Sequence, residues 1–273
     1  MSDVYSKWLL VSDIDGTLNN KKRKLPPVNK TAIGAFVANG GNFTLCSGRN
    51  LKSLTPHFLN LGVETPALFL NGAGIYDFKS RKMLAFKPFS AEAEKVLIET
   101  ANNYFAVDLT MFSPDMLYIV KPFFFGRFAA WLDKLPHKLC KNGRGIDSGN
   151  IGKATFFGLN STLKRIRNDL TCGDKQLFDC FFTSPYTLEV VSCGVNKGAA
   201  VKELAGILNI PLENTAAVGD YYNDIDMLKA VAHPVCCGQA PDEIKDLSEY
   251  VACHCNDGAV ADFINYIETK YIK

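Results

Sequence analysis

Short apolar runs alternate with segments of helical period at both ends of the chain. The runs end at polar or glycine-containing stretches, which is typical of strands buried on both faces of a parallel sheet. The pattern predicts an α/β fold, with a parallel sheet covered by helices on both faces. The predicted strands span residues 7–13, 42–46, 67–70, 215–218, 234–236 and 250–252. The predicted helices span residues 28–39, 51–61, 196–208, 223–230 and 258–270.

The middle of the chain, from about residue 83 to 189, has a different pattern. Aromatic-rich strands are grouped there with helices, which indicates an α+β insert rather than more of the parallel sheet. Predicted strands span 116–120, 154–159, 178–183 and 187–191, and predicted helices span 91–104, 125–135 and 161–171. We therefore expect one domain built from residues 1–82 and 190–273, and a second from 83–189. The chain would cross between them near Pro88 and residues 192–195.

Composition narrows the class of protein. A hydrophobic content of 47% and a charged content of 21% are ordinary for a globular protein and argue against disorder or a coiled coil. The net charge of +2 provides no general attraction for nucleic acid or a membrane surface. The apolar run at residues 8–11 is too short for a signal peptide, and no segment is long enough to span a membrane, so we expect a cytoplasmic protein. No pattern indicates an oligomeric state.

The nine cysteines are predicted to be free thiols. Their number is odd, they are scattered, and secretion is not indicated, so disulfides are not expected. Cys253, His254 and Cys255 suggest zinc, but no second Cys/His pair follows at the spacing of a zinc finger. Structural zinc is therefore not predicted.

Four polar clusters follow predicted strands or open a predicted helix. They are Asp13-Ile14-Asp15-Gly16-Thr17, Ser47-Gly48-Arg49, Asn196-Lys197-Gly198 and Gly219-Asp220-Tyr221-Tyr222-Asn223-Asp224. Each has a plain structural explanation when taken alone. Asp-x-Asp-Gly is common in turns, Ser47 fits a helix cap, Lys197 an exposed helix lysine, and the later aspartates a turn and a first helical turn. Their joint placement at the carboxyl ends of strands is where open α/β sheets bind ligands.

Together these residue types supply what phosphoryl transfer requires. Asp13 would serve as a nucleophile and Asp15 as a proton donor, while Ser47 and Lys197 would hold phosphate oxygens. The carboxylates of Asp13 and Asp220, with that of Asp224 as a further candidate, are hard oxygen ligands of the kind that Mg²⁺ prefers. A divalent cation would also relieve the repulsion between several carboxylates and a phosphate dianion. We expect crowding by like charges to raise the pKa of Asp15 so that it can donate a proton.

The four motifs, in this order, resemble those of the haloacid dehalogenase superfamily. The long insert, Asn71-Gly72 and the run from Gly194 to Gly198 resemble its Cof-type sugar phosphatases. The resemblance implies a Rossmann-like core with an inserted α+β cap. It implies that Asp13 attacks phosphorus to form an aspartyl-phosphate and that Asp15 protonates the leaving alcohol and then activates water.

The same resemblance assigns the remaining residues of the site. Ser47, Gly48 and Lys197 would bind the phosphoryl group. The carboxylates of Asp13 and Asp220 and the backbone carbonyl of Asp15 would bind Mg²⁺. Asn223, Asp224 and Asn71 would support these groups.

The chain departs from the family pattern at a few positions. Tyr221-Tyr222 follows Gly219-Asp220 where a small polar residue is common, and Gln239 stands where Asn is usual. Lys141, Arg144 and Lys153 lie in the glycine-containing part of the insert and are candidates to contact an anionic substrate, although loop cations usually face water. Lys153 matches a frequent family lysine to which the sequence assigns no role.

The sequence therefore predicts a Mg²⁺-dependent phosphatase for small phosphorylated metabolites, with sugar phosphates as the expected class. Two alternatives stay open. A phosphosugar mutase would use the same residues, and a non-catalytic protein that binds phosphorylated metabolites could share the fold. A dinucleotide site is excluded, because Gly72-Ala73-Gly74 lacks the third spaced glycine and the helix that follows it.

Overall fold

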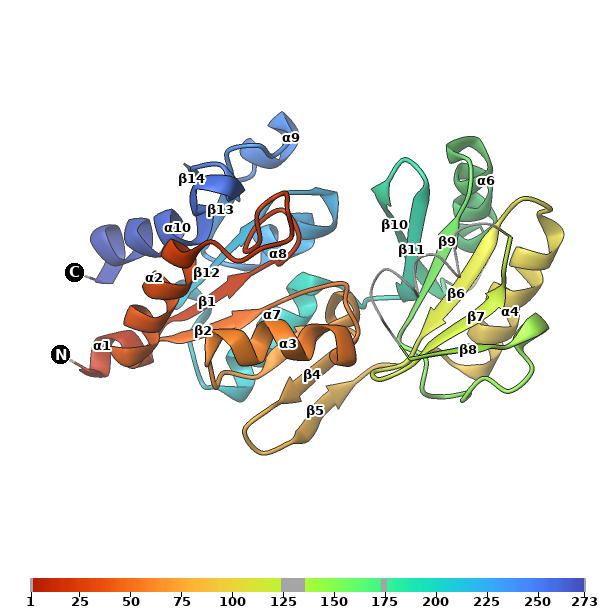
Figure 1. The fold of residues 1–273 in the computed structure, drawn as a ribbon, viewed down its shortest axis with the longest axis horizontal. Helices are drawn as coiled ribbons and strands as arrows, with labels where there is room; N and C mark the ends of the chain where they lie inside the picture. The colour runs from red at the N-terminus through yellow and green to blue at the C-terminus, as the bar shows by residue number, and fades with distance from the viewer. Residues whose placement is uncertain (1, 124–135, 173–175, 273) are drawn as a thin grey trace.

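The protein has two main β-sheets that lie side by side, each with its own helices (Figure 1). The structure is a computed structural model that describes residues 2–123, 136–172 and 176–272. The expected helix at residues 125–135 lies outside the described residues. The described helices are α1 (Ser2–Ser6), α2 (Pro27–Ala38), α3 (Leu51–Leu61), α4 (Ala91–Asn103), α6 (Asn160–Thr171), α7 (Lys197–Ile207), α8 (Ile225–Ala230), α9 (Asp242–Lys245) and α10 (Ala259–Ile267). Short helical turns are η1 (Leu70–Gly72), η2 (Lys141–Gly143), η3 (Leu212–Asn214), η4 (Tyr222–Asp224), η5 (Cys255–Asp257) and η6 (Glu268–Ile272).

The first sheet is parallel throughout, as the alternation of strands and helices predicts. Its order is β14-β13-β12-β1-β2, which places β1 between β12 and β2. The strands are β1 (Leu9–Ser12), β2 (Asn42–Leu45), β12 (Thr215–Gly219), β13 (His233–Cys237) and β14 (Tyr250–Ala252). Every residue of β1 is buried, as expected for a strand covered on both faces.

Helices cover both faces of this sheet. Leu10 of β1 packs in a core with residues of α2, α3 and α10, whereas Leu9 and Val11 pack in a second core with residues of α7 and α8. This division follows from the period of two along a strand, which turns successive side chains to opposite faces. The predicted α/β class is therefore confirmed.

The predicted strand at residues 67–70 does not extend the parallel sheet. It forms β3 (Ala67–Phe69), which pairs antiparallel with β4 (Gly74–Asp77), and β4 pairs with β5 (Lys82–Phe86). One isolated parallel bridge, between Cys46 and Leu68, connects β3 to the end of β2. The short connection between β3 and β4 is possible because antiparallel strands, unlike parallel ones, need no long crossover.

The second sheet has six strands in the order β10-β11-β9-β6-β7-β8. They are β6 (Asp108–Phe112), β7 (Leu117–Lys121), β8 (His137–Leu139), β9 (Lys153–Phe157), β10 (Phe178–Ser184) and β11 (Thr187–Ser192). Helices α4 and α6 pack on the face turned away from the first sheet (Figure 1). The other face is turned toward the carboxyl ends of β1 and β2.

The crossings lie a few residues beyond the expected domain boundaries at 82 and 190. Strand β5 continues to Phe86 in the three-stranded sheet, and β11 continues to Ser192 in the six-stranded sheet. The hydroxyl of Ser192 donates to the backbone oxygen of Pro88, so the two crossings lie against each other.

Candidate active site

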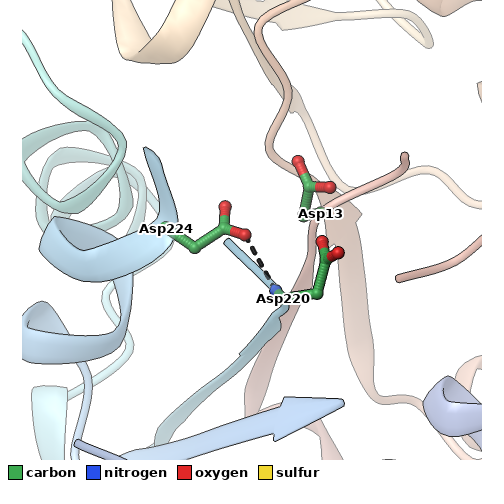
Figure 2. A group of neighbouring side chains, drawn as sticks. All are labelled: Asp13, Asp220 and Asp224. Carbon is green, nitrogen blue, oxygen red and sulfur yellow. Dashed lines mark hydrogen bonds between the residues drawn. The ribbon is translucent and has the colours of Figure 1, made fainter. Parts of the chain in front are cut away.

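Three adjacent strands of the parallel sheet end at the same place. Asp13 follows β1, Ser47 follows β2 after one residue, and Asp220 follows β12. Their side chains meet because parallel neighbours present their carboxyl ends at one edge. Figure 2 shows the carboxylates of Asp13, Asp220 and Asp224 around one small space. The turn η4 carries Asp224 back to this edge, where it accepts a hydrogen bond from the backbone nitrogen of Asp220 at 3.0 Å.

Lys197, the first residue of α7, contacts this cluster and is 1% exposed. Its Nζ donates to Asp13 at 2.5 Å and to Asp224 at 2.6 Å. Burial alone would lower the pKa of Lys197, but the charges of Asp13 and Asp224 raise it well above its ordinary value, so the lysine stays protonated. The sequence placed Lys197 at the phosphate; the structure also makes it the fixed cation that orients the two carboxylates.

The three carboxylates fit a divalent cation. Asp13, Asp220 and Asp224 each offer an oxygen, and these oxygens lie within 4.8 Å of one another. Burial raises the pKa of Asp13, and the charges of Asp224 and Asp220 add to this rise against the attraction of Lys197. Burial, with the charge of Asp224, raises the pKa of Asp220 to about 6. A cation such as Mg²⁺ would oppose both rises and has the preference for oxygen ligands that this donor set satisfies.

Asp15 does not have the raised pKa that the sequence predicted. Its side chain is 48% exposed and is held by Arg49, whose Nε and Nη2 each donate to one carboxylate oxygen at 2.8 Å. Partial burial acts to raise the pKa of Asp15, but the hydrogen bonds and charge of Arg49 outweigh it and lower the pKa below its ordinary value. The predicted rise through crowding by like charges was therefore wrong, because the crowded carboxylates are Asp13, Asp220 and Asp224.

The turn that follows Asp15 is held by contacts that the sequence motif did not specify. Gly16 has a φ of +87°, and a Cβ there would lie 2.4 Å from the carboxylate of Asp220. Thr17 donates to Asp220 at 3.0 Å, and the amide of Gln239 donates to the backbone oxygen of Gly16 at 2.6 Å. The family-atypical Gln239 thus ties this turn to the strand end after β13.

Asn71, Gly48 and Asn223 also lie at this edge. Asn71 lies in η1 after β3, and its backbone nitrogen donates to Ser47 at 3.0 Å. Its side chain donates to Glu189 of the six-stranded sheet at 2.6 Å. The backbone oxygen of Gly48 accepts from Lys153 at 2.6 Å, and Asn223 lines the cavity described next. All nine predicted site residues are therefore brought together within the described structure.

A cavity of about 500 Å³ lies between the carboxyl edge of the parallel sheet and the facing side of the six-stranded sheet. From the parallel sheet its walls include Asp13, Asp15, Ser47, Gly48, Asp220 and Asn223. From the six-stranded sheet they include Phe112, Lys153, Thr155, Phe157, Thr187 and Glu189. Lys153, Thr155 and Phe157 alternate along β9, so they share one face of the sheet. The alternation of side chains along a strand could have shown from the sequence that these three residues share a face. It could not have shown that this face lies opposite the residues of the parallel sheet.

The cysteines form no metal site within the described residues. All nine are free thiols, and the group of three potential ligands found in the described chain consists of aspartates alone. None of the described helices has the length and hydropathy needed to cross a membrane.

The chain matches known proteins over nearly its whole length. The family model of haloacid dehalogenase-like hydrolases matches residues 10–264. The pyridoxal phosphate phosphatase YbhA of Escherichia coli is 23% identical, covering 94% of this chain and 97% of its own. The HMP-PP phosphatase of Serratia proteamaculans is 27% identical, covering 97% of each chain.

A solved structure has the same fold. The subclass IIB sugar phosphatase BT4131 superposes with a TM-score of 0.82 at 19% identity, covering 95% of this chain and 98% of that one. The overall fold is therefore shared, and the family match extends over the site. The chain belongs to the haloacid dehalogenase-like hydrolases and, as the resemblance of its motifs implied, is a phosphoric monoester hydrolase of the Cof type.

Proposed function

We propose that this protein hydrolyses small phosphorylated metabolites, sugar phosphates among them, through an aspartyl-phosphate on Asp13. The observation that carries the proposal is the buried Asp13 carboxylate at the wall of the cavity, oriented by Lys197 at 2.5 Å. One oxygen of Asp13 is engaged by the lysine, which leaves the other for attack on phosphorus. A carboxylate nucleophile splits hydrolysis into two easier steps.

The remaining residues have separate roles in this proposal. Asp13 and Asp220, with the backbone carbonyl of Asp15, would hold Mg²⁺, and Asp224 and Asn223 would support them. The bound cation would supply positive charge beside the phosphoryl oxygens. Ser47, Gly48 and Lys197 would bind the phosphoryl group, which places the developing charge between fixed donors.

Asp15 would exchange the proton in both steps. In the first it would protonate the leaving oxygen, and in the second it would take a proton from the attacking water. Partial burial acts to raise the pKa of this carboxylate, but the hydrogen bonds and charge of Arg49 lower it and so favour the ionised form. The approach of a substrate phosphate would compete with Asp15 for Arg49 and so return Asp15 toward its protonated form.

The size and polarity of the cavity support a small, polar leaving group. Its volume of about 500 Å³ is within the usual range for small-metabolite sites. Two side-chain atoms of cavity-lining residues, Nδ2 of Asn50 and Oγ1 of Thr155, are buried with no hydrogen-bond partner in the described part of the chain. A buried polar group without a partner is costly, so a polar ligand there would be stabilised. We also propose that residues 83–189 act as the cap that selects the substrate.

The test is a panel of phosphate esters with Mg²⁺, covering sugar phosphates and pyridoxal phosphate, with free phosphate and isomerised product measured separately. We expect release of phosphate, and Asp13→Asn should lower kcat by at least about 10³-fold because it removes the nucleophile. Phosphosugar isomerisation without free phosphate would identify a mutase instead. Tight binding without turnover, or full activity of Asp13→Asn, would reject the proposal.

A further inference from the structure

Lys153 and Glu189 form an ion pair on the face of the six-stranded sheet that borders the cavity. Lys153 Nζ lies 2.6 Å from Oε1 of Glu189, and the two side chains are 5% and 12% exposed. They lie on adjacent strands, β9 and β11. Glu189 is opposite Thr155, two residues along β9 from Lys153, so the two side chains are diagonal neighbours on the same face. The pair is therefore preorganised by the sheet.

Each partner of the pair also bonds to the parallel-sheet body. Lys153 donates to the backbone oxygen of Gly48 at 2.6 Å, and the second oxygen of Glu189 accepts from Asn71 at 2.6 Å. Gly48 lies between Ser47 and Arg49, and Asn71 is bonded to the backbone oxygen of Ser47 at 3.0 Å. The ion pair thus holds the Ser47–Gly48–Arg49 loop from two sides.

The backbone around this contact is adapted to it. A Cβ at Gly48 would lie 2.8 Å from Oδ1 of Asn71 and 3.3 Å from Oε2 of Glu189. Leu70 and Asn71 have φ values of 49° and 56°, a left-handed conformation that non-glycine residues rarely adopt. Strained backbone of this kind persists where surrounding contacts hold it, often at functional sites.

We propose that Lys153 and Glu189 are positioning residues that hold the Ser47–Gly48–Arg49 loop in the conformation that binds phosphate. The six-stranded sheet packs against the strand ends of the parallel sheet through the same two side chains that hold the phosphate-binding loop. Packing of the sheet and assembly of the phosphate site are therefore coupled. Since Glu189 compensates the charge of Lys153, the pair presents no net charge to the leaving group. This inference rests on the proposed function, since it assigns the loop to the substrate's phosphate.

The rival explanations are a direct contact of Lys153 with an anionic substrate and a purely structural ion pair. Three variants separate them: Lys153→Met, Glu189→Gln and the double variant. Lys87→Met is the control. Lys87 forms an ion pair with Glu203 at the same N–O distance of 2.6 Å, but neither residue lines the cavity. The measurements are kcat and KM, the Kd of inorganic phosphate with Mg²⁺ by calorimetry, and the thermal midpoint of each variant.

We expect Lys153→Met to raise both KM and the Kd of inorganic phosphate about tenfold, the scale of one charge-assisted hydrogen bond. Glu189→Gln should act in the same direction, and Lys87→Met should leave both values unchanged. The double variant removes the uncompensated charge and should recover thermal stability relative to Lys153→Met. Its phosphate affinity should stay low, because no donor to Gly48 remains.

Other outcomes overturn the inference. Phosphate affinity that recovers together with stability in the double variant would show a purely structural pair. A loss confined to substrates with a second anionic group, with unchanged binding of inorganic phosphate, would show direct contact. If Lys153→Met does not fold, unchanged KM and phosphate Kd in Glu189→Gln reject the inference. Wild-type protein that binds phosphate but turns over no ester would instead reject the proposed function.

Discussion

The start of helix α7 offers a sharp test, because Gly198 follows the buried Lys197. A Cβ at Gly198 would lie 2.1 Å from the backbone oxygen of Asp226 in α8 and 3.0 Å from Cβ of Ala230. Contacts between nonbonded heavy atoms are optimal near 3.5 Å, so Gly198→Ala must move the two helices apart by roughly 1 Å. Overpacking of this kind costs about 1–3 kcal/mol.

The same helix contains its own control at Gly206, where a Cβ would meet nothing within 4 Å. Gly206→Ala should raise stability by up to about 1 kcal/mol, because alanine has the higher helix propensity. At roughly 2–4 °C per kcal/mol for a protein of this size, Gly206→Ala should raise Tm by a few degrees and Gly198→Ala should lower it.

The two variants should also differ in enzymatic activity. A displacement of about 1 Å in a catalytic group can cost on the order of 100-fold in rate, so Gly198→Ala should lower kcat/KM by up to that factor through Lys197. Gly206→Ala should leave kcat/KM unchanged. The assays are thermal unfolding by circular dichroism and phosphate release with Mg²⁺. If Gly198→Ala matches Gly206→Ala in both Tm and kcat/KM, the argument that close packing of α7 on α8 places Lys197 is refuted.

Two further predictions concern the metal site and the thiols. Chelation by EDTA should abolish activity. Mg²⁺ at about 100 times its Kd should restore activity and stabilise the protein by roughly 2.7 kcal/mol. Full activity of the metal-free protein would contradict the role given to Asp13, Asp220 and Asp224. In native protein Cys172 and Cys193 should react fastest with Ellman's reagent, because both are exposed, and all nine thiols should react after unfolding; fewer than nine thiols under nonreducing denaturation would indicate a disulfide.

Local patterns were sufficient for most elements that bear the site. The strands that end at Asp13, Ser47 and Asp220 are short apolar runs buried on both faces, so their boundaries were predicted within a few residues. The strands β4, β5, β6 and β8 were missed. Every residue of β8 is exposed, as are Lys82, Met83 and Leu84 of β5, and both strands are held by pairing with neighbours rather than by an apolar pattern of their own.

The side-chain pairings within the site were not predictable in the same way. Asp15 and Asp13 are two residues apart, yet one pairs with Arg49 and the other with Lys197. Opposite pKa directions follow from this difference in partners and burial. Sequence spacing records which groups are present, whereas a pKa depends on what surrounds each group in space.

The sequence by itself determined the α/β class, the family and the set of groups available for phosphoryl transfer, because these depend on local periodicity and on residue types after particular strands. Only the tertiary structure decided how those groups are paired, where the cavity lies and which residues of the insert border it. Lys153 and Glu189 are 36 residues apart, and their contacts with Gly48 and Asn71 join segments separated by 105 and 118 residues. Contacts at such separation arise from the packing of two sheets, which no local pattern encodes.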